Sequence, residues 1–258
     1  MSEDAATAAG LSDGERRGLA EDLRILALLQ DREPTAELIG SLRASGVERM
    51  LTLKLDGERG RAASEFFAAA IAEETTSTDR AGLEELAADY AAIYLNHTHR
   101  VSPSESPWID PEGLTSQQPM FEVRDWYRHW GLETPNWRER PDDHLVVQLE
   151  FVAHLLAAVE SPAALIDAAR FLDRHIMRWY GSFADGVMKR CWTPYWAAVV
   201  GLTDAHLEAL RDRLGRVPGC ERVAFETIEA EKERRRQAAV AETCASASAF
   251  VPGTGPTL

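Results

Sequence analysis

The residues best suited to chemistry lie in one stretch, RERPDDHLVVQLEFVAHLL, which runs from Arg138 to Leu156. Proline and acidic residues there precede an apolar pattern that has the spacing of a buried helical face. Asp142 and Asp143 fall in the expected first turn of this helix. Carboxylates at such positions accept unpaired backbone N–H groups and favour the positive end of the helix dipole. A structural role at a helix start is therefore one sufficient reason for both aspartates.

The same helix predicts a polar line along one face. Asp143, Glu150 and His154 are spaced at i, i+7 and i+11. At about 100° per residue, their side chains project in nearly the same direction. Three interpretations fit such a line: a solvated face, a face that binds a ligand, and a catalytic or metal-binding face. The residue types alone leave all three open.

Two histidines beside a proline-rich loop, His97 and His99, offer a second kind of chemistry. Their H-x-H spacing is weak evidence for a metal, because zinc-binding helices place two histidines four residues apart with a glutamate between them. The sequence also contains no glycine-rich phosphate loop, nucleophile elbow or dinucleotide-binding motif. We therefore predict a protein without an enzymatic centre and without a cofactor. The alternative is a helical metal-dependent hydrolase that uses His97, His99, Asp143 and His144.

Composition and charge exclude two classes of partner, nucleic acid and the membrane. The chain has 258 residues, of which 28 are basic and 42 acidic, so its formal net charge is −14. A field of this sign repels nucleic acid and anionic lipid. Charged residues also interrupt each apolar stretch before it reaches the roughly 18 residues of a membrane span. We expect no nucleic-acid partner and no stable membrane insertion. The acidic N-terminal segment lacks the basic and apolar regions of an export signal, so we expect a cytoplasmic location.

Residues that start and stop helices recur along the sequence, whereas alternating strand patterns are almost absent, so we predict an all-α fold. One example is the capping box formed by Ser12 and Glu15, and another is Ser161 before a proline at the first helical position. Arg16 and Arg17 are expected on a helix surface. The predicted helices cover a segment that ends before Pro34 and residues 35–44, 62–74, 79–95, 119–130, 142–159, 162–180, 184–200, 204–214 and 221–239.

These helices are expected to form a single domain of about ten helices over residues 1–242. A long Pro-rich loop between His97 and Gln118 interrupts them. Loops of this length inside compact domains are usually functional or disordered. Trp108 and Ile109 favour docking of this loop onto the body. Residues 243–258 are rich in Ala, Ser, Gly, Pro and Thr, and we expect them to form a disordered tail.

Four segments, taken in order, carry a resemblance to a known family. They are a helix end with Asp89, Tyr90 and Tyr94; a Pro-rich loop with Ser106, Trp108 and Asp110; PMFEV at Pro119 to Val123, followed by Trp126, Tyr127 and Gly131; and Pro141, Asp142, Asp143 and His144, followed by Glu150 and Phe151. The third segment resembles an E-V-x-x-[FW]-Y helix, and the fourth resembles a P-x-D-H helix start. Together they resemble the TorD/DmsD/NarJ family of cytoplasmic chaperones for molybdenum-containing oxidoreductases.

The resemblance implies an all-helical protein that binds the twin-arginine signal peptide of a catalytic subunit. Such a chaperone holds the apo subunit until the molybdenum cofactor is inserted and then releases it for export. The segments NHTHRVSPSESPW, QQPMFEV and WRERPDDHL resemble most the branch that serves type II enzymes of the dimethyl sulfoxide reductase family. Clients of that branch include selenate, chlorate, dimethyl sulfide and ethylbenzene oxidoreductases.

The resemblance also indicates which residues contact the client. A signal peptide with two guanidinium groups and an apolar stretch requires carboxylates beside an apolar groove. Asp143 and Glu122 are the predicted carboxylates, whereas Trp108, Trp126 and Tyr94 are the predicted apolar contacts. For His144, two roles stay open: it orients the loop by hydrogen bonding, or it completes the helix start. The predicted client-binding set is Tyr94, Trp108, Glu122, Trp126, Pro141, Asp143 and His144.

Overall fold

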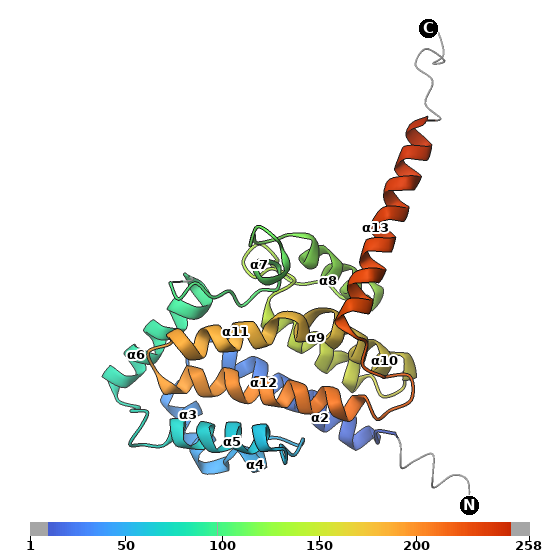
Figure 1. The fold of residues 1–258 in the computed structure, drawn as a ribbon. Coiled ribbons are helices and arrows are strands. Elements are labelled where there is room, and N and C mark those ends of the chain that lie inside the picture. The colour runs from blue at the N-terminus through green and yellow to red at the C-terminus, as the bar shows by residue number, and fades with distance from the viewer. Residues whose placement is uncertain (1–9, 97, 249–258) are drawn as a thin grey trace, which may run out of the picture. The chain divides into compact units, whose positions relative to one another are not determined.

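The computed structural model describes residues 10–96 and 98–248, and within them the regular structure is entirely helical (Figure 1). Ten of the α-helices are ten residues long or longer, which confirms the predicted all-α fold of about ten helices. None of the described helices is both long and apolar enough to cross a bilayer. In chain order the elements are α2 (Asp13–Asp31), α3 (Ala36–Ser45), α4 (Val47–Met50), α5 (Glu58–Ile71), α6 (Arg80–Tyr90), the π-helical η1 (Ala91–Leu95), α7 (Ser106–Ile109), α8 (Gln118–His129), α9 (Leu145–Ala157), α10 (Pro162–Phe171), the π-helical η2 (Leu172–Ile176), α11 (Met177–Arg190), α12 (Pro194–Leu214) and α13 (Phe225–Ser248).

The chain divides into two compact units, Met1–Arg222 and Val223–Leu258. The first unit contains α2 to α12, and the second contains α13. This boundary lies before residue 242, where the end of the helical domain was expected. The helix α13 continues through Ser248 because its last turns are rich in alanine, which has the highest helix propensity. Residues 249–258 lie outside the described residues, and disorder of the tail stays a prediction.

The core of the first unit is arranged around α9. The helix α2 packs along α9, and α12 packs against both α11 and α5 (Figure 1). The residues of α9 are apolar on most sides of the helix, which is typical of a buried helix. Its fully buried residues include Leu149, Val152 and Leu156. Because α9 is held on several sides, its first residues are a fixed platform for the loops that meet it.

Capping side chains begin several of the described helices, including the two predicted caps, Ser12 and Ser161. The Ser12 hydroxyl accepts a hydrogen bond from the backbone N–H of Glu15 at 3.2 Å, which confirms half of the predicted capping box. Thr35, Asp79 and Ser161 cap α3, α6 and α10 in the same way. Each side chain satisfies an N–H group that the first turn of a helix leaves unpaired.

The helices predicted over residues 184–200 and 204–214 have the wrong boundaries. The helix α11 continues to Arg190, and after a short break α12 runs unbroken through Leu214. The break coincides with Pro194, which lacks a backbone N–H and is favoured in the first turn of a helix. A proline that starts a helix therefore lies where the apolar pattern had indicated a helix interior.

Arg16 is buried, contrary to the expectation of a surface position, whereas Arg17 is exposed as expected. The Arg16 guanidinium donates hydrogen bonds of 2.8 to 3.3 Å to the carbonyl oxygens of Leu155, Leu156, Ala158 and Val159. These carbonyl oxygens lie at and just after the end of α9, where the last turn of a helix leaves them without N–H donors of its own. Arg16 therefore caps the C-terminus of the central helix.

The helix α9 begins at Leu145, three residues later than predicted, and His144 is its N-cap. Both aspartates before His144 therefore lie in the preceding loop and not in the first helical turn. The predicted polar line is also wrong, because Glu150 and His154 are exposed on α9 while Asp143 is buried ahead of it. The physical reason is that the backbone before α9 bonds to the Pro-rich loop.

Candidate functional site

The Pro-rich segment of residues 98–117, hereafter the 98–117 loop, docks on the body as predicted. Trp108 and Ile109 pack against the hydrophobic core, and the Trp108 indole N–H donates to a loop carbonyl at 2.8 Å. Gly186 on α11 makes room for this contact. A Cβ atom at that position would lie 2.7 Å from Val101 Cγ1 and 3.6 Å from the Trp108 ring. Close approach of the loop to α11 therefore requires a glycine.

Asp143 fastens the 98–117 loop to the start of α9. Its Oδ2 accepts hydrogen bonds from the Ser106 backbone N–H at 2.8 Å and from the Ser106 hydroxyl at 2.5 Å. Backbone bonds flank this contact, from Glu105 N–H to the Asp143 carbonyl at 3.0 Å and from Leu145 N–H to the Pro103 carbonyl at 2.8 Å. We call the Asp143–Ser106 contact the latch. It joins two segments that are 37 residues apart in sequence.

The latch carboxylate is withdrawn from solvent. Asp143 is completely buried, and this burial raises the pKa of its carboxyl group, although the bonds from Ser106 lower it in part. The nearby Glu105 charge raises the same pKa further. The second oxygen, Oδ1, has no hydrogen-bond partner among the described residues. In this conformation Asp143 positions the loop, and its charge is not presented at the surface.

A buried polar cluster that the sequence did not predict lies beside the latch. The fully buried Glu105 carboxylate accepts a hydrogen bond from Gln148 Nε2 at 2.7 Å and lies 3.1 Å from His175 Nδ1. Arg178 Nη1 lies 4.0 Å from the same carboxylate. These partners come from α9, η2 and α11, so Glu105 ties the loop to three elements. No local sequence signal marks Glu105, because the partners of its side chain are all distant in sequence.

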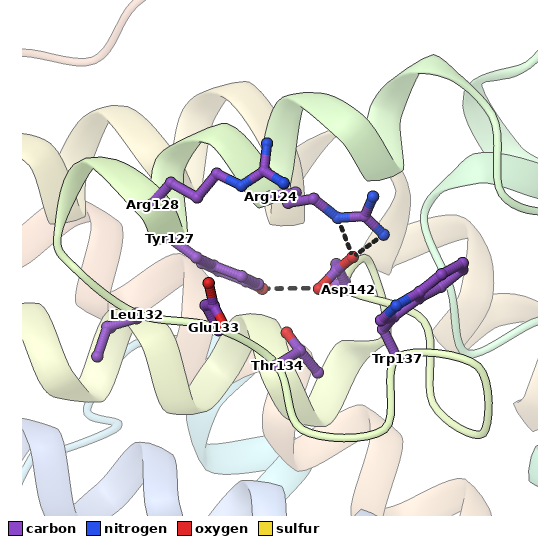
Figure 2. Close-up of a pocket in the computed structure, with 8 residues that line it drawn as sticks. All are labelled: Arg124, Tyr127, Arg128, Leu132, Glu133, Thr134, Trp137 and Asp142. Carbon is purple, nitrogen blue, oxygen red and sulfur yellow. Dashed lines mark hydrogen bonds and ion pairs between the residues drawn. The ribbon is translucent and has the colours of Figure 1, made fainter.

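Asp142 faces α8, where it meets Arg124 (Figure 2). Arg124 Nε and Nη2 lie 2.8 and 2.6 Å from one Asp142 carboxylate oxygen. Tyr127 donates its hydroxyl proton to the Asp142 carbonyl at 2.9 Å, and burial raises the pKa of Tyr127 well above its ordinary value. The Arg124 guanidinium carbon lies 4.9 Å from the Trp137 ring centre and 5.4 Å from that of Phe121. A cavity of about 180 Å³ adjoins these groups.

Two residues of the predicted client-binding set, Glu122 and Trp126, are half-buried on α8. The Trp126 ring lies edge-on to Phe171 and His175, with centroid distances of 5.8 and 6.4 Å. Trp126 therefore adjoins the Glu105 cluster through His175. Pro141 is also half-buried, directly before the two aspartates. The structure thus gathers Trp126, Pro141 and the latch around the start of α9.

His144 completes the helix start, one of its two predicted roles. Its Nδ1 accepts a hydrogen bond from the Val146 backbone N–H at 3.2 Å, and its backbone forms an isolated antiparallel bridge with Ser104. Tyr94 lies elsewhere, in the core, where its hydroxyl donates to Gln30 Oε1 at 3.1 Å and its ring stacks on Tyr90 at 4.9 Å. Burial raises the Tyr94 pKa well above its usual range. In this conformation Tyr94 offers no surface to a client.

The alternative metal site is not assembled in the described part of the chain. His99 Nε2 lies 2.9 Å from a carboxylate oxygen of Asp89, whose other oxygen accepts N–H groups at the start of α12. Among the described residues, no group of three or more His, Cys, Asp or Glu side chains is arranged to hold a metal ion. His99, Asp143 and His144 are therefore not brought together as ligands, and His97 lies outside the described residues.

The docked 98–117 loop, α8 and the latched start of α9 lie in the region that matches a known family. The family described as nitrate reductase delta subunit matches residues 55–185, just over half of the chain, so the chain belongs to this family. The match includes the 98–117 loop, α8 and the whole of α9. Membership confirms the resemblance to TorD-type chaperones that the sequence motifs indicated.

Individual relatives carry the names of chaperones. The chain is 30% identical to the chaperone protein TorD of Vibrio cholerae over 109 residues, which cover 39% of this chain and 49% of that protein. It is 34% identical to TorD of Ferrimonas balearica over 82 residues, 31% of this chain and 38% of the relative. A perchlorate reductase assembly chaperone protein of Dechloromonas aromatica is 29% identical over 139 residues, 47% of this chain and 62% of the relative. The chain thus spans about half the length of the curated relatives it matches.

Proposed function

We propose that this chain is a cytoplasmic chaperone for the catalytic subunit of a molybdenum-containing oxidoreductase. It binds the subunit's twin-arginine signal peptide and its apo form, assists insertion of the cofactor and delays export until the subunit is mature. The observation that carries this proposal is the family match over residues 55–185, which contain the latch and α8. The names of the relatives support a non-enzymatic role. We further propose a client from the type II branch of the dimethyl sulfoxide reductase family.

The chemistry of the α8 region supports a peptide of this kind. A twin-arginine signal peptide combines two guanidinium groups with an apolar stretch, so its receptor requires acceptors for the first and apolar contacts for the second. Phe121 and Trp137 expose 46% and 40% of their surface beside the Asp142 carboxylate. Glu122, which lies on α8, supplies a second carboxylate in addition to Asp142. The net charge of −14 also attracts a cationic peptide over a longer range.

The predicted client-binding residues divide into two roles under this proposal. Trp108, Glu122 and Trp126 keep part of their surface accessible and contact the client. Pro141, Asp143 and His144 act through the 98–117 loop, because the latch and the N-cap determine where that loop lies on α9. Tyr94 supports the core behind them. The division is based on burial, since a fully buried carboxylate can reach a ligand only if the loop moves.

Maturation of a client in cells tests this function. A type II catalytic subunit is co-expressed with the wild-type chain, without it, or with a Trp108→Ala, Trp126→Ala double variant. We expect molybdenum per exported subunit to be highest with the wild-type chain and to fall to background without it. The double variant should fall between them, whereas Leu28→Ala, which removes an exposed apolar side chain from α2, should match the wild type. Equal molybdenum content with and without the chain would refute the proposal.

A further inference from the structure

Arg124 occupies a site whose parts are those that recognise a guanidinium group. Asp142 supplies a charged acceptor at 2.8 Å, and the rings of Phe121 and Trp137 lie within cation–π range of the guanidinium carbon. Stacking on an aromatic face combined with a charge-assisted hydrogen bond is a pairing that arginine makes better than lysine. We call Asp142, Phe121 and Trp137 the cradle. The chain's own Arg124 fills it in this structure, and Arg138 also lies over the Trp137 ring, 4.8 Å from its centre.

The cradle is accessible from solvent on its aromatic side. Phe121 and Trp137 are exposed, whereas the Asp142 side chain is only 3% exposed. The adjoining cavity of about 180 Å³ opens beside Arg124 (Figure 2). Thr134 lines it, and its buried hydroxyl oxygen has no hydrogen-bond partner among the described residues. A side chain that enters this cavity meets the Trp137 ring, the buried Asp142 carboxylate and the unpaired Thr134 hydroxyl group.

We infer that the cradle binds an arginine of the client peptide and that Arg124 competes with this client arginine for the cradle. The inference rests on the proposed function and deepens it, because it assigns arginine recognition to Asp142. The neighbouring Asp143 is committed to the latch, whereas Asp142 already binds a guanidinium. A client arginine takes the place of Arg124 on the same carboxylate and between the same rings. Arg124 is on the surface helix α8 and moves into solvent when it is displaced.

Peptide titrations of Arg124 variants test this competition. A competitor that fills the cradle nine-tenths of the time weakens apparent affinity about tenfold, so Arg124→Ala should bind a twin-arginine peptide about tenfold more tightly than the wild type. Arg124→Lys keeps the charge but loses the planar fork, and its affinity should be intermediate. The matched control is Arg128→Ala, which removes the same charge from the same helix and cavity. Its affinity should stay within about twofold of the wild type, since the exposed ion pair of Arg128 with Asp125 contributes little.

A thermal unfolding experiment reports on the cradle without a peptide. Millimolar ethylguanidinium chloride should raise the Tm of Arg124→Ala by filling the vacated cradle, but should not raise that of Arg128→Ala. Ethylammonium chloride at the same concentration controls for ionic strength. Unchanged or weaker peptide binding by folded Arg124→Ala, or no selective effect of ethylguanidinium, would overturn the inference. If ethylguanidinium stabilises Arg124→Ala while neither the wild type nor any variant binds the peptide, the proposed function fails and the guanidinium site stands.

Discussion

The interaction energy of the latch between Asp143 and Ser106 can be measured by a double-mutant cycle. The variants are Asp143→Ala, Ser106→Ala and the double substitution. Both side chains are completely buried, and neither lies in the interior of a long helix, so helix propensity contributes little to the comparison. The cycle isolates the energy of the contact from the separate cost of each truncation.

The hydrogen bonds of the latch give the expected magnitudes. Ser106→Ala removes the hydroxyl bond of 2.5 Å to a charged acceptor, which costs about 1.5–3 kcal/mol of unfolding free energy. Asp143→Ala also removes the 2.8 Å bond from the Ser106 N–H and leaves both donors unpaired. Against this, it relieves a buried carboxylate whose desolvation raises its pKa. We therefore expect a loss of about 2–4 kcal/mol for Asp143→Ala and a coupling energy of about 1–2 kcal/mol.

Urea unfolding at pH 7, followed by the helical circular dichroism signal, supplies the four free energies. If the latch is a direct contact, the double variant should be less destabilised than the sum of the two single variants. Single losses that add to within about 0.5 kcal/mol, the usual result for independent sites, would refute the reasoning.

Three further predictions concern stability and are read by the same urea unfolding assay. Because burial raises the folded-state pKa of Asp143, its stabilising contribution is complete below the unfolded pKa of about 3.9 and is lost as pH rises through the folded value. The wild type should therefore lose stability relative to Asp143→Asn above about pH 4, and parallel pH profiles would contradict this. Arg16→Gln should cost about 2–4 kcal/mol because it uncaps α9, whereas Arg17→Gln should change stability by less than about 0.5 kcal/mol; equal effects would exclude the cap. Gly186→Ala should destabilise the protein by about 1–2 kcal/mol because the new Cβ meets the loop, although alanine has a higher helix propensity than glycine. The control Gly40→Ala, where the new Cβ lies in open space, should stabilise the protein by about 0.5–1 kcal/mol.

The helices were predictable because their start signals are local. A capping side chain and the N–H group from which it accepts a hydrogen bond are three residues apart, as at Ser12, Thr35, Asp79 and Ser161. The missed boundary before Pro194 has a local signal too, a threonine followed by proline. There the apolar pattern continues across the break and favours a helix in spite of the Thr-Pro signal.

The sequence indicates segments that meet at the start of α9 but not the contacts between them. The apolar pattern places Asp143 in a helix turn, whereas Asp143 bonds to Ser106, 37 residues away. Arg16 was assigned to a surface although it caps carbonyls about 140 residues further along the chain. No sequence pattern marks Glu105. Hydrophobic periodicity reports which face of a helix is buried, but it carries no information about which distant polar groups meet there.

The central claim, that the chain binds a twin-arginine signal peptide, is tested most directly by calorimetric titration with that peptide and with its twin-lysine counterpart. Both peptides carry the same charge, but only arginine supplies the planar group that stacks and donates in pairs. We predict saturable one-to-one binding of the twin-arginine peptide and at least about tenfold weaker binding of the twin-lysine peptide. Equal affinities, or no binding of the twin-arginine peptide, would contradict the claim.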